Sequence, residues 1–168
     1  MLDDHSNDVV LKRPEQIDIE AIKRWYCMTD ILGYATGAKD FSEIAEIIQS
    51  PGRSNSLILI IHERNSSHPI GFTYANINKI ANRTILWIRI LLIDPCFQNK
   101  GFGTAAINKL LSYVKLRYKS ITCVVTVSDN NDKGLYFWEK AGFSNAQELE
   151  ELLHREGTSG VSIMKKDI

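Results

Sequence analysis

Apolar residues recur along the chain at two spacings, and each spacing predicts one kind of element. Where they return every three or four positions, an amphipathic helix is expected. Where β-branched and aromatic residues follow one another closely between turn-forming residues, a strand is expected. The first half is thus predicted to contain a strand, two helices and three strands, over residues 9–12, 18–28, 41–49, 57–62, 70–76 and 84–93, with a loop at Gly33–Gly37.

Beyond residue 94 the pattern predicts a helix, a strand, a second helix and two more strands. The second helix is expected to be capped by Asp129 or Asn130 and to stop at Gly142, because Asp and Asn are favoured before a helix and glycine just after it. These elements are predicted over residues 104–117, 121–127, up to 141, 146–155 and 161–165, with a turn at 157–160. The order fits one α/β domain over residues 1–168, with a mixed sheet and helices on both faces.

Composition narrows the classes of protein that fit. Twenty basic residues balance twenty acidic ones in a chain of 168 residues, which argues against a broad nucleic-acid surface. The longest apolar runs are too short to span a bilayer, and the acidic N-terminus is unlike a secretory signal. Cys27, Cys96 and Cys123 are widely spaced, as in a reducing compartment, and the histidines lack metal-ligand spacing. We therefore expect a cytoplasmic protein with no metal, nucleic-acid or membrane partner.

The segment Gln98–Thr104 carries two glycines separated by one residue, between a strand end and a helix start. Glycines let the backbone turn without Cβ clashes, so that successive amides can point into one concavity at the positive end of the helix. Such an arrangement binds a phosphate or pyrophosphate. Lys100 adds a mobile charge and Thr104 a hydroxyl. The alternative is a plain strand–turn–helix connection.

Two other phosphate-binding loops are compared with this segment. A nucleotide P-loop requires Gly-Lys-Ser/Thr, whereas Gly103 is followed by Thr-Ala, so that motif is rejected. Gly101, Gly103 and Ala106 match the dinucleotide fingerprint G-x-G-x-x-A. That fingerprint places its first glycine directly after the strand, but residues 95–100 intervene here. A small dinucleotide-binding protein stays open as the weaker alternative.

The segment resembles the Q-x-x-G-x-G acetyl-CoA loop of the GNAT superfamily of N-acetyltransferases, and Leu91–Pro95 resembles the strand that leads into it. A second motif follows in order: Asn131–Phe143 resembles the family's N-x-x-A…Y-E-K-x-G-F helix. The resemblance implies a mostly antiparallel, mixed sheet of six to seven strands that splays between the fourth and fifth strands. It also implies acetyl-CoA as co-substrate.

The same resemblance implies which residues hold acetyl-CoA. Backbone groups of Leu91 and Ile93 would face the pantetheine arm, and Asn131 would hydrogen-bond it. Trp138 and Lys140 belong to the second cofactor-binding motif. The pyrophosphate would lie on the loop formed by Gln98, Asn99, Lys100, Gly101, Phe102, Gly103 and Thr104.

The chain departs from the family at the proton-transfer groups. Trp138 stands where the family usually has a tyrosine credited with protonating the departing sulfur, and Tyr136 lies about 200° away around the helix. Acid help to a thiol of pKa about 8.5 is worth roughly 2 kcal/mol at pH 7, whereas deprotonating an amine of pKa about 10.4 costs more than about 4 kcal/mol. A base therefore matters more than the missing acid.

The predicted strand 84–93 contains no carboxylate that could serve as this base. The candidates are Asp94, which could instead cap the turn, and Asp30 in the loop after the first helix; a base acting through a water molecule is a further alternative. Trp25 and Tyr34 could form an aromatic wall for the acceptor, or Trp25 could belong to the core.

The function expected from the resemblance is direct transfer of an acetyl group from acetyl-CoA to a primary amine. The acceptor would be a small molecule or a protein N-terminus, and the enzyme a monomer or homodimer. The missing tyrosine and strand carboxylate leave open an acyl-CoA-binding module without catalysis.

Overall fold

The computed structural model describes residues 8–36, 39–50, 55–150 and 160–168. Its helices are α1 (Asp18–Tyr26), α2 (Thr29–Thr36), α3 (Phe41–Gln49), α4 (Phe102–Lys115) and α5 (Asp132–Lys140), with 3₁₀ turns η1 (Pro95–Phe97) and η2 (Gln147–Leu149). Its strands are β1 (Val9–Lys12), β2 (Ser56–Glu63), β3 (Pro69–Ile80), β4 (Arg83–Ile93), β5 (Thr122–Ser128), β6 (Ser144–Asn145) and β7 (Val161–Asp167).

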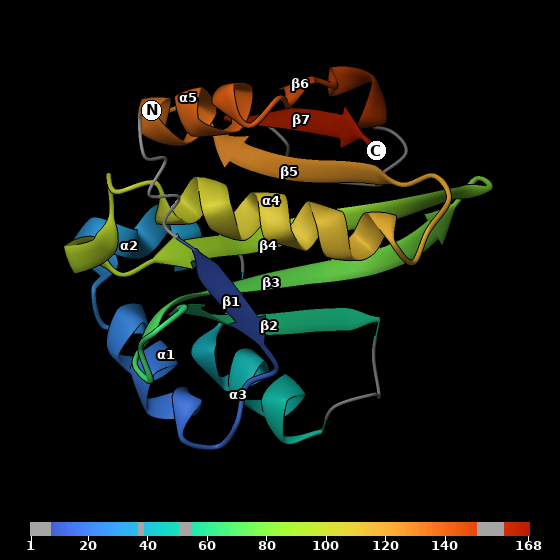
Figure 1. Ribbon diagram of the computed structural model, residues 1–168. Coiled ribbons are helices and arrows are strands. Elements are labelled where there is room, and N and C mark those ends of the chain that lie inside the picture. The colour runs from blue at the N-terminus through green and yellow to red at the C-terminus, as the bar shows by residue number, and fades with distance from the viewer. Residues whose placement is uncertain (1–7, 37–38, 51–54, 151–159) are drawn as a thin grey trace, which may run out of the picture.

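The strands form one sheet in the order β1-β2-β3-β4-β5-β7-β6 (Figure 1). Every neighbouring pair is antiparallel except β4 and β5, which are parallel and joined through α4. The expected mixed, mostly antiparallel sheet is therefore confirmed.

The two parallel strands pair over only part of their length. Ladder pairs run from Ile85 with Thr122 to Ile88 with Val125. Beyond these pairs β4 continues to Ile93 and β5 to Ser128, with each strand paired only on its other edge. Figure 1 shows the carboxyl ends of β4 and β5 lying apart. The expected splay between the fourth and fifth strands is confirmed.

A β-bulge in β4 lies next to the point where this pairing ends. Ala75 of β3 faces Ile88, but Tyr74 faces Ile90, so that Arg89 is the extra residue. In a regular strand, residues of the same parity share one face. Here Ile88 packs in the cluster that includes α4, whereas Ile90 packs in the cluster that includes α1 and α3. The bulge thus exchanges the two faces of β4 and bends the strand.

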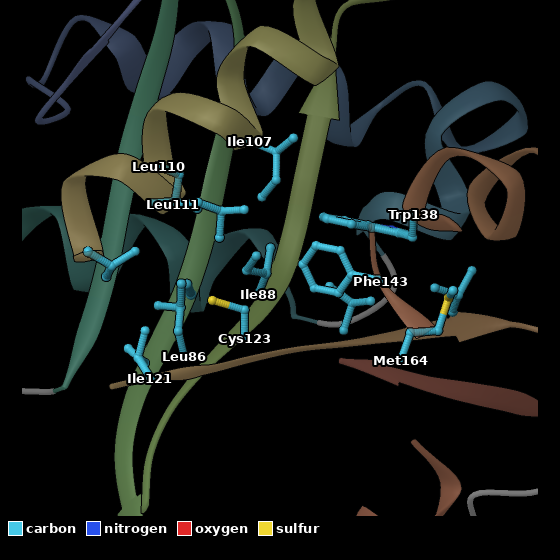
Figure 2. Close-up of a cluster of buried hydrophobic side chains, with 14 of the residues drawn as sticks. Leu86, Ile88, Ile107, Leu110, Leu111, Ile121, Cys123, Trp138, Phe143 and Met164 are labelled. Atoms are coloured by element: carbon cyan, nitrogen blue, oxygen red, sulfur yellow. The ribbon is translucent and has the colours of Figure 1, made fainter. Parts of the chain in front are cut away.

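Helices cover both faces of the sheet, as expected. On one face α1, α2 and α3 bury side chains against β2, β3 and β4, including Trp25, Leu32 and Ile44. On the other face α4 lies across the strands (Figure 1). Figure 2 shows its apolar side chains directed at β4 and β5, beside Trp138 of α5. No helix within the described ranges is long and apolar enough to cross a membrane.

Three local predictions are wrong. Gly33 lies inside α2 instead of a loop, because burial of the neighbouring Leu32 outweighs the low helix propensity of glycine. The side chain that caps α5 belongs to Asn131, not to Asp129 or Asn130. The strand expected over residues 146–155 is the 3₁₀ turn η2 where it is described, because Ala146 and Leu149 are buried three positions apart.

Other expected boundaries lie close to the observed ones. The helix expected from residue 104 begins at Phe102, and the helix expected to stop at Gly142 does so, with Gly142 at a φ of 87°. Residues 151–159, which include most of the expected turn at 157–160, lie outside the described residues.

Truncation of one core residue of α4 tests the packing in Figure 2. Leu110 is 1% exposed, so Leu110→Ala is expected to lower the free energy of unfolding by about 2 to 5 kcal/mol, through lost burial and the cavity left behind. The matched control is Leu116→Ala at the end of the same helix, where the side chain is 89% exposed and the change should stay within about 0.5 kcal/mol. Urea unfolding measures both, and equal losses would contradict the packing of α4.

Candidate active site

A cavity of about 830 Å³ lies between the diverging ends of β4 and β5. Residues 88–91 and 93 of β4 and 125–128 of β5 form two of its walls. The loop before α4, the first turn of α5 and one side of α2 complete it. The cavity therefore occupies the place where the ladder between the parallel strands stops.

The backbone of the loop before α4 is arranged to bind an anion. Asn99 and Gly101 have φ values of 59° and 83°, which turns the chain sharply before the helix. The first backbone bond into α4 joins Ala105 N–H to the Gly101 carbonyl, so the preceding amides of the first turn have no helical acceptor. These amides carry the positive end of the helix dipole.

Gly103 lets the start of α4 approach α5 closely. A Cβ at this position would lie 3.2 Å from the ring of Phe137. Gln98 secures the other end of the loop, because its Nε2 donates to the Ile93 carbonyl at 2.9 Å. The loop is thus held between β4 and α5, and Gln98, Asn99, Gly101, Gly103 and Thr104 line the cavity.

The side chains of three residues expected at the cofactor lie away from the cavity. Lys100 Nζ donates to the Cys96 carbonyl at 2.9 Å, and Phe102 is buried in the cluster between α4 and β1. Lys140 is exposed, and its ammonium lies 5.0 Å from the ring centre of Tyr136. None of these side chains is on the described cavity wall, so Lys100 and Phe102 contribute through their backbone at most.

The second motif supplies Asn131 and Trp138 to the wall. The Oδ1 atom of Asn131 accepts from the Gly134 N–H at 3.0 Å and so caps α5. Trp138 is 9% exposed and packs edge-on against Phe137 and Phe143, at ring distances of 5.1 and 4.9 Å (Figure 2). Tyr136 is 59% exposed and off the wall, so it does not replace the family's tyrosine.

Asp94 ties the end of β4 to α1. Its Oδ2 accepts from Trp25 Nε1 at 2.8 Å, and its Oδ1 accepts from the Cys96 N–H at 2.9 Å. Burial alone would raise the pKa of this carboxyl, but these hydrogen bonds and the charge of Arg24 outweigh burial and hold the pKa below 3.8. Both oxygens are engaged and the residue is off the cavity wall, which is the geometry of a turn cap and anchor.

The aromatic residues proposed for an acceptor wall separate in the structure. Trp25 is fully buried and stacks on Phe72 at 5.9 Å, so it is a core residue and does not reach the cavity. Tyr34 of α2 lines the cavity, is 63% exposed, and donates from its hydroxyl to the Asn130 carbonyl at 3.4 Å. Asp30 is exposed in the first turn of α2, outside the wall.

Sequence reasoning missed several cavity residues. Arg89 lines the cavity at the bulge, and Thr126 and Ser128 line it from β5. A signal for Arg89 was present: a single charge inside an otherwise apolar strand is costly to bury and points to a site. The β5 residues have no such signal, because their role follows only from the lost pairing with β4.

Comparison with solved structures agrees with this fold. A domain from Methanocaldococcus jannaschii superposes with a TM-score of 0.71 at 17% identity, covering 96% of this chain and 99% of that one. The spermidine N-acetyltransferase of Vibrio cholerae, solved with CoA and spermine, superposes with a TM-score of 0.69 at 21% identity, covering 96% and 95%. Both are similar in fold.

Comparison of sequences gives more specific information than comparison of folds. An uncharacterized N-acetyltransferase of M. jannaschii is 33% identical over 82 residues, which are 47% of this chain and 36% of that protein. The match therefore spans only about a third of that relative's own length. The model of the acetyltransferase (GNAT) family matches residues 19–143, which span the α1–α3 layer, the cavity and α5. The chain belongs to the acetyltransferase (GNAT) family.

Proposed function

We propose that this chain transfers the acetyl group of acetyl-CoA to a primary amine by direct attack of the amine on the thioester. One observation carries the proposal: a turn whose backbone amides have no helical acceptor lines a cavity formed where two parallel strands stop pairing. A diphosphate with a long amide-containing arm has the chemistry to fit both parts. The acceptor is a small molecule or a protein N-terminus.

The residues present fit acetyl-CoA as a substrate. The first-turn amides of α4 and the loop around Gly101 would hold the pyrophosphate. Past Ile88 and Val125, the facing edges of β4 and β5 no longer bond each other, so their backbone groups are available to the amides of pantetheine. Leu91 and Ile93 on one strand and Asn131 beyond the other would flank that arm.

The bound thioester supplies a carbonyl that an amine can attack. A backbone N–H of β4 near Ile93, on the edge that has lost its partner, would donate to the oxyanion. Trp138 provides an apolar wall and no acid, and the thiol can leave as a thiolate because its pKa is about 8.5.

The acceptor must lose a proton before it attacks, and the carboxylates suggested by the sequence are poorly placed for this. Asp94 is committed to Trp25 and Cys96, and Asp30 is off the wall. We therefore propose that water takes the proton. Asp94 is not the base, and it contributes by holding the end of β4 in place.

Polyamines are a second acceptor class, since a similar fold was solved with CoA and spermine. An acyl-CoA-binding module without catalysis would bind the cofactor but turn over no amine. The dinucleotide interpretation of Gly101 and Gly103 is not retained, because that fold is built on a parallel sheet, whereas among the strands that the structure describes only β4 and β5 are parallel.

The remaining expectations stay proposals. A cytoplasmic location is supported by the free thiols of Cys27, Cys96 and Cys123. A metal-free reaction is consistent with the described residues, which contain no group of three or more His, Cys, Asp or Glu placed to hold an ion. We also propose a monomer or homodimer that has no nucleic-acid or membrane partner, in keeping with the balanced charge.

A charge placed in the first turn of α4 tests the cofactor site. Thr104 is exposed and lines the cavity, so Thr104→Glu should repel a diphosphate while suiting the helix dipole. We expect acetyl-CoA to bind wild type, adding roughly 2.7 kcal/mol at a hundred times its dissociation constant, and to bind the variant at least tenfold more weakly, about 1.4 kcal/mol. Thermal unfolding with and without acetyl-CoA measures both.

The matched control is Thr104→Gln, which has similar size and no charge and should bind nearly as wild type does. An equal rise of the midpoint in all three proteins would place the diphosphate away from the loop. A rise with NADH instead of acetyl-CoA would overturn the proposed function.

Replacement of Asp94 separates an anchor from a base. Asp94→Asn should cost about 1 to 3 kcal/mol of stability, since a hydrogen-bonded buried carboxylate is lost. The pKa of Asp94 is depressed in the fold, so its contribution is present above its ordinary value of 3.8 and lost as the pH falls below it. The stability gap between wild type and variant should therefore narrow in acid, as measured by urea unfolding.

Acetyl transfer by folded Asp94→Asn near neutral pH should stay within a few-fold of wild type. Trp25→Phe removes the donor and keeps the carboxylate, and it should also lower the free energy of unfolding. A loss of activity of about 10² to 10⁴ in Asp94→Asn alone would identify Asp94 as the base after all.

A further inference from the structure

The cavity has two sides, because its walls come from both faces of the sheet. The loop before α4 and the first turn of α5 line it from the face on which α4 and α5 pack. Helix α2 lines it from the opposite face, where Leu32 packs with Ile90 and Leu92 of β4. The first side is the one proposed above to hold acetyl-CoA. An acceptor that meets the thioester from outside the cofactor therefore approaches along α2.

Helix α2 presents two large apolar side chains on this side of the cavity. Ile31 and Tyr34 lie three positions apart, so they share one face of the helix, and both line the cavity. They are nevertheless 64% and 63% exposed. The other large apolar side chains that are exposed in the described ranges are Ile17, Leu116 and Tyr136, and they lie off the wall. Exposed apolar surface gathered in a concave site is typical of ligand binding.

Tyr34 also reaches across the cavity. Its hydroxyl donates at 3.4 Å to the carbonyl of Asn130, which lies between β5 and α5 and is part of the wall. The phenol ring therefore spans the distance from α2 to the wall beyond β5. A hydrogen bond this long and exposed is weak, so it leaves the ring able to move when a ligand binds.

Strand β5 adds polar groups on the same side as α2. Val125 and Val127 pack in the cluster with α4, whereas Val124 packs in a separate cluster that contains no residue of α4. Since side chains alternate along a strand, Thr126 and Ser128 share the face of Val124, and both line the cavity. A hydroxyl oxygen has two acceptor sites, so these residues can bind an amino group without carrying a charge.

Carboxylates, which would suit an acceptor with several positive charges, are few on the described wall. Helix α2 carries one carboxylate, Asp30, and it lies off the wall. Of the described wall residues only Asp132 is acidic, and it lies in the first turn of α5 beside Lys133. The α2 side of the described wall thus offers apolar surface and hydroxyl groups, which suit a single amino group joined to an apolar group.

We propose that Ile31 and Tyr34 determine acceptor specificity, and that the acceptor is a small primary monoamine with an aryl or branched alkyl group close to its nitrogen. This inference rests on the proposed acetyl transfer and names its substrate class. The apolar group would lie against Ile31 and the ring of Tyr34, where apolar surface is removed from water. The amino group would lie near Thr126 and Ser128. Its nitrogen bonds the acetyl carbon and loses one proton to water, while the C–S bond breaks to release CoA thiolate.

Acetyl transfer to a series of amines tests the inference. Phenethylamine and isopentylamine are compared with ethylamine and spermidine by release of CoA thiol, with rates expressed per concentration of free amine. Wild type should use at least one of the two apolar amines with a kcat/KM at least about tenfold above that of ethylamine and of spermidine. The reason is that even one methylene group in an apolar pocket changes kcat/KM by roughly 10- to 200-fold.

Serine substitutions identify the surface responsible. Ile, Tyr and Ser have similar helix propensities, so Ile31→Ser and Tyr34→Ser change the cavity wall with little effect on α2. The two combined should bring kcat/KM for the apolar amine to within about threefold of that for ethylamine, mainly through a raised KM for the apolar amine. Tyr34→Phe keeps the ring and loses the hydrogen bond to Asn130, so it should retain the preference.

The matched control is Ile17→Ser, because Ile17 is an exposed isoleucine that precedes α1 and lies off the wall. It should leave the ratio of apolar amine to ethylamine unchanged. The thermal midpoint and its rise with acetyl-CoA check the folding of each variant. If the combined variant does not fold, Ile31→Ser alone decides, with an expected fall in the ratio of at least about threefold.

Two results would overturn the inference while leaving acetyl transfer intact: use of spermidine or ethylamine at least as efficiently as the apolar amines, or an unchanged ratio in the serine variants. Faster transfer to peptides than to either apolar amine would also overturn it and indicate a protein N-terminus as the acceptor. Failure of wild type to bind acetyl-CoA, or binding with transfer to no amine, would overturn the proposed function and with it this inference.

Discussion

The ladder between β4 and β5 ends at Ile88 and Val125, and the site depends on that break. Parallel neighbours in the middle of a sheet normally continue to bond along their length, because unsatisfied backbone groups are costly away from water. Here β4 and β5 keep their outer partners, β3 and β7, and give up each other. The facing edges then line a cavity in the interior of the sheet.

The bulge and the anchors explain how the break is held. An extra residue at Arg89 bends β4 at the last ladder pair and exchanges its two faces, so that Ile90 and Leu92 meet the α1–α3 layer. Asp94 then fixes the far end of the strand through Trp25 of α1, and Gln98 fixes the following loop through the Ile93 carbonyl. The end of the strand is therefore held by α1 on one side and by the loop before α4 on the other.

Most of the fold could be predicted from local patterns in the sequence. The features that these patterns missed depend on pairing between distant segments. Helical periodicity predicted α1, α3 and α4 within a few residues, and two glycines before a helix predicted the turn at Gly101, because these signals lie within one segment. The bulge depends on the register between β3 and β4, and the partner of Asp94 lies 69 residues away, so neither can be read from a single segment. The loop predicted at Gly33 was wrong for the same reason, since the burial of Leu32 against the sheet is a tertiary effect.

Side chains capable of acid–base chemistry are scarce around this cavity, and that scarcity is consistent with the reaction. At the wall position where the family resemblance predicts a tyrosine, the chain has a buried Trp138, packed on Phe137 and Phe143. A thiol leaves without an acid at modest cost, so an apolar wall in place of an acid, which also excludes water, costs the reaction little. The larger barrier is the charged amine, which must lose a proton before it can attack. The amides at the start of α4 place positive potential at one end of the slot, where the proposed diphosphate would bind.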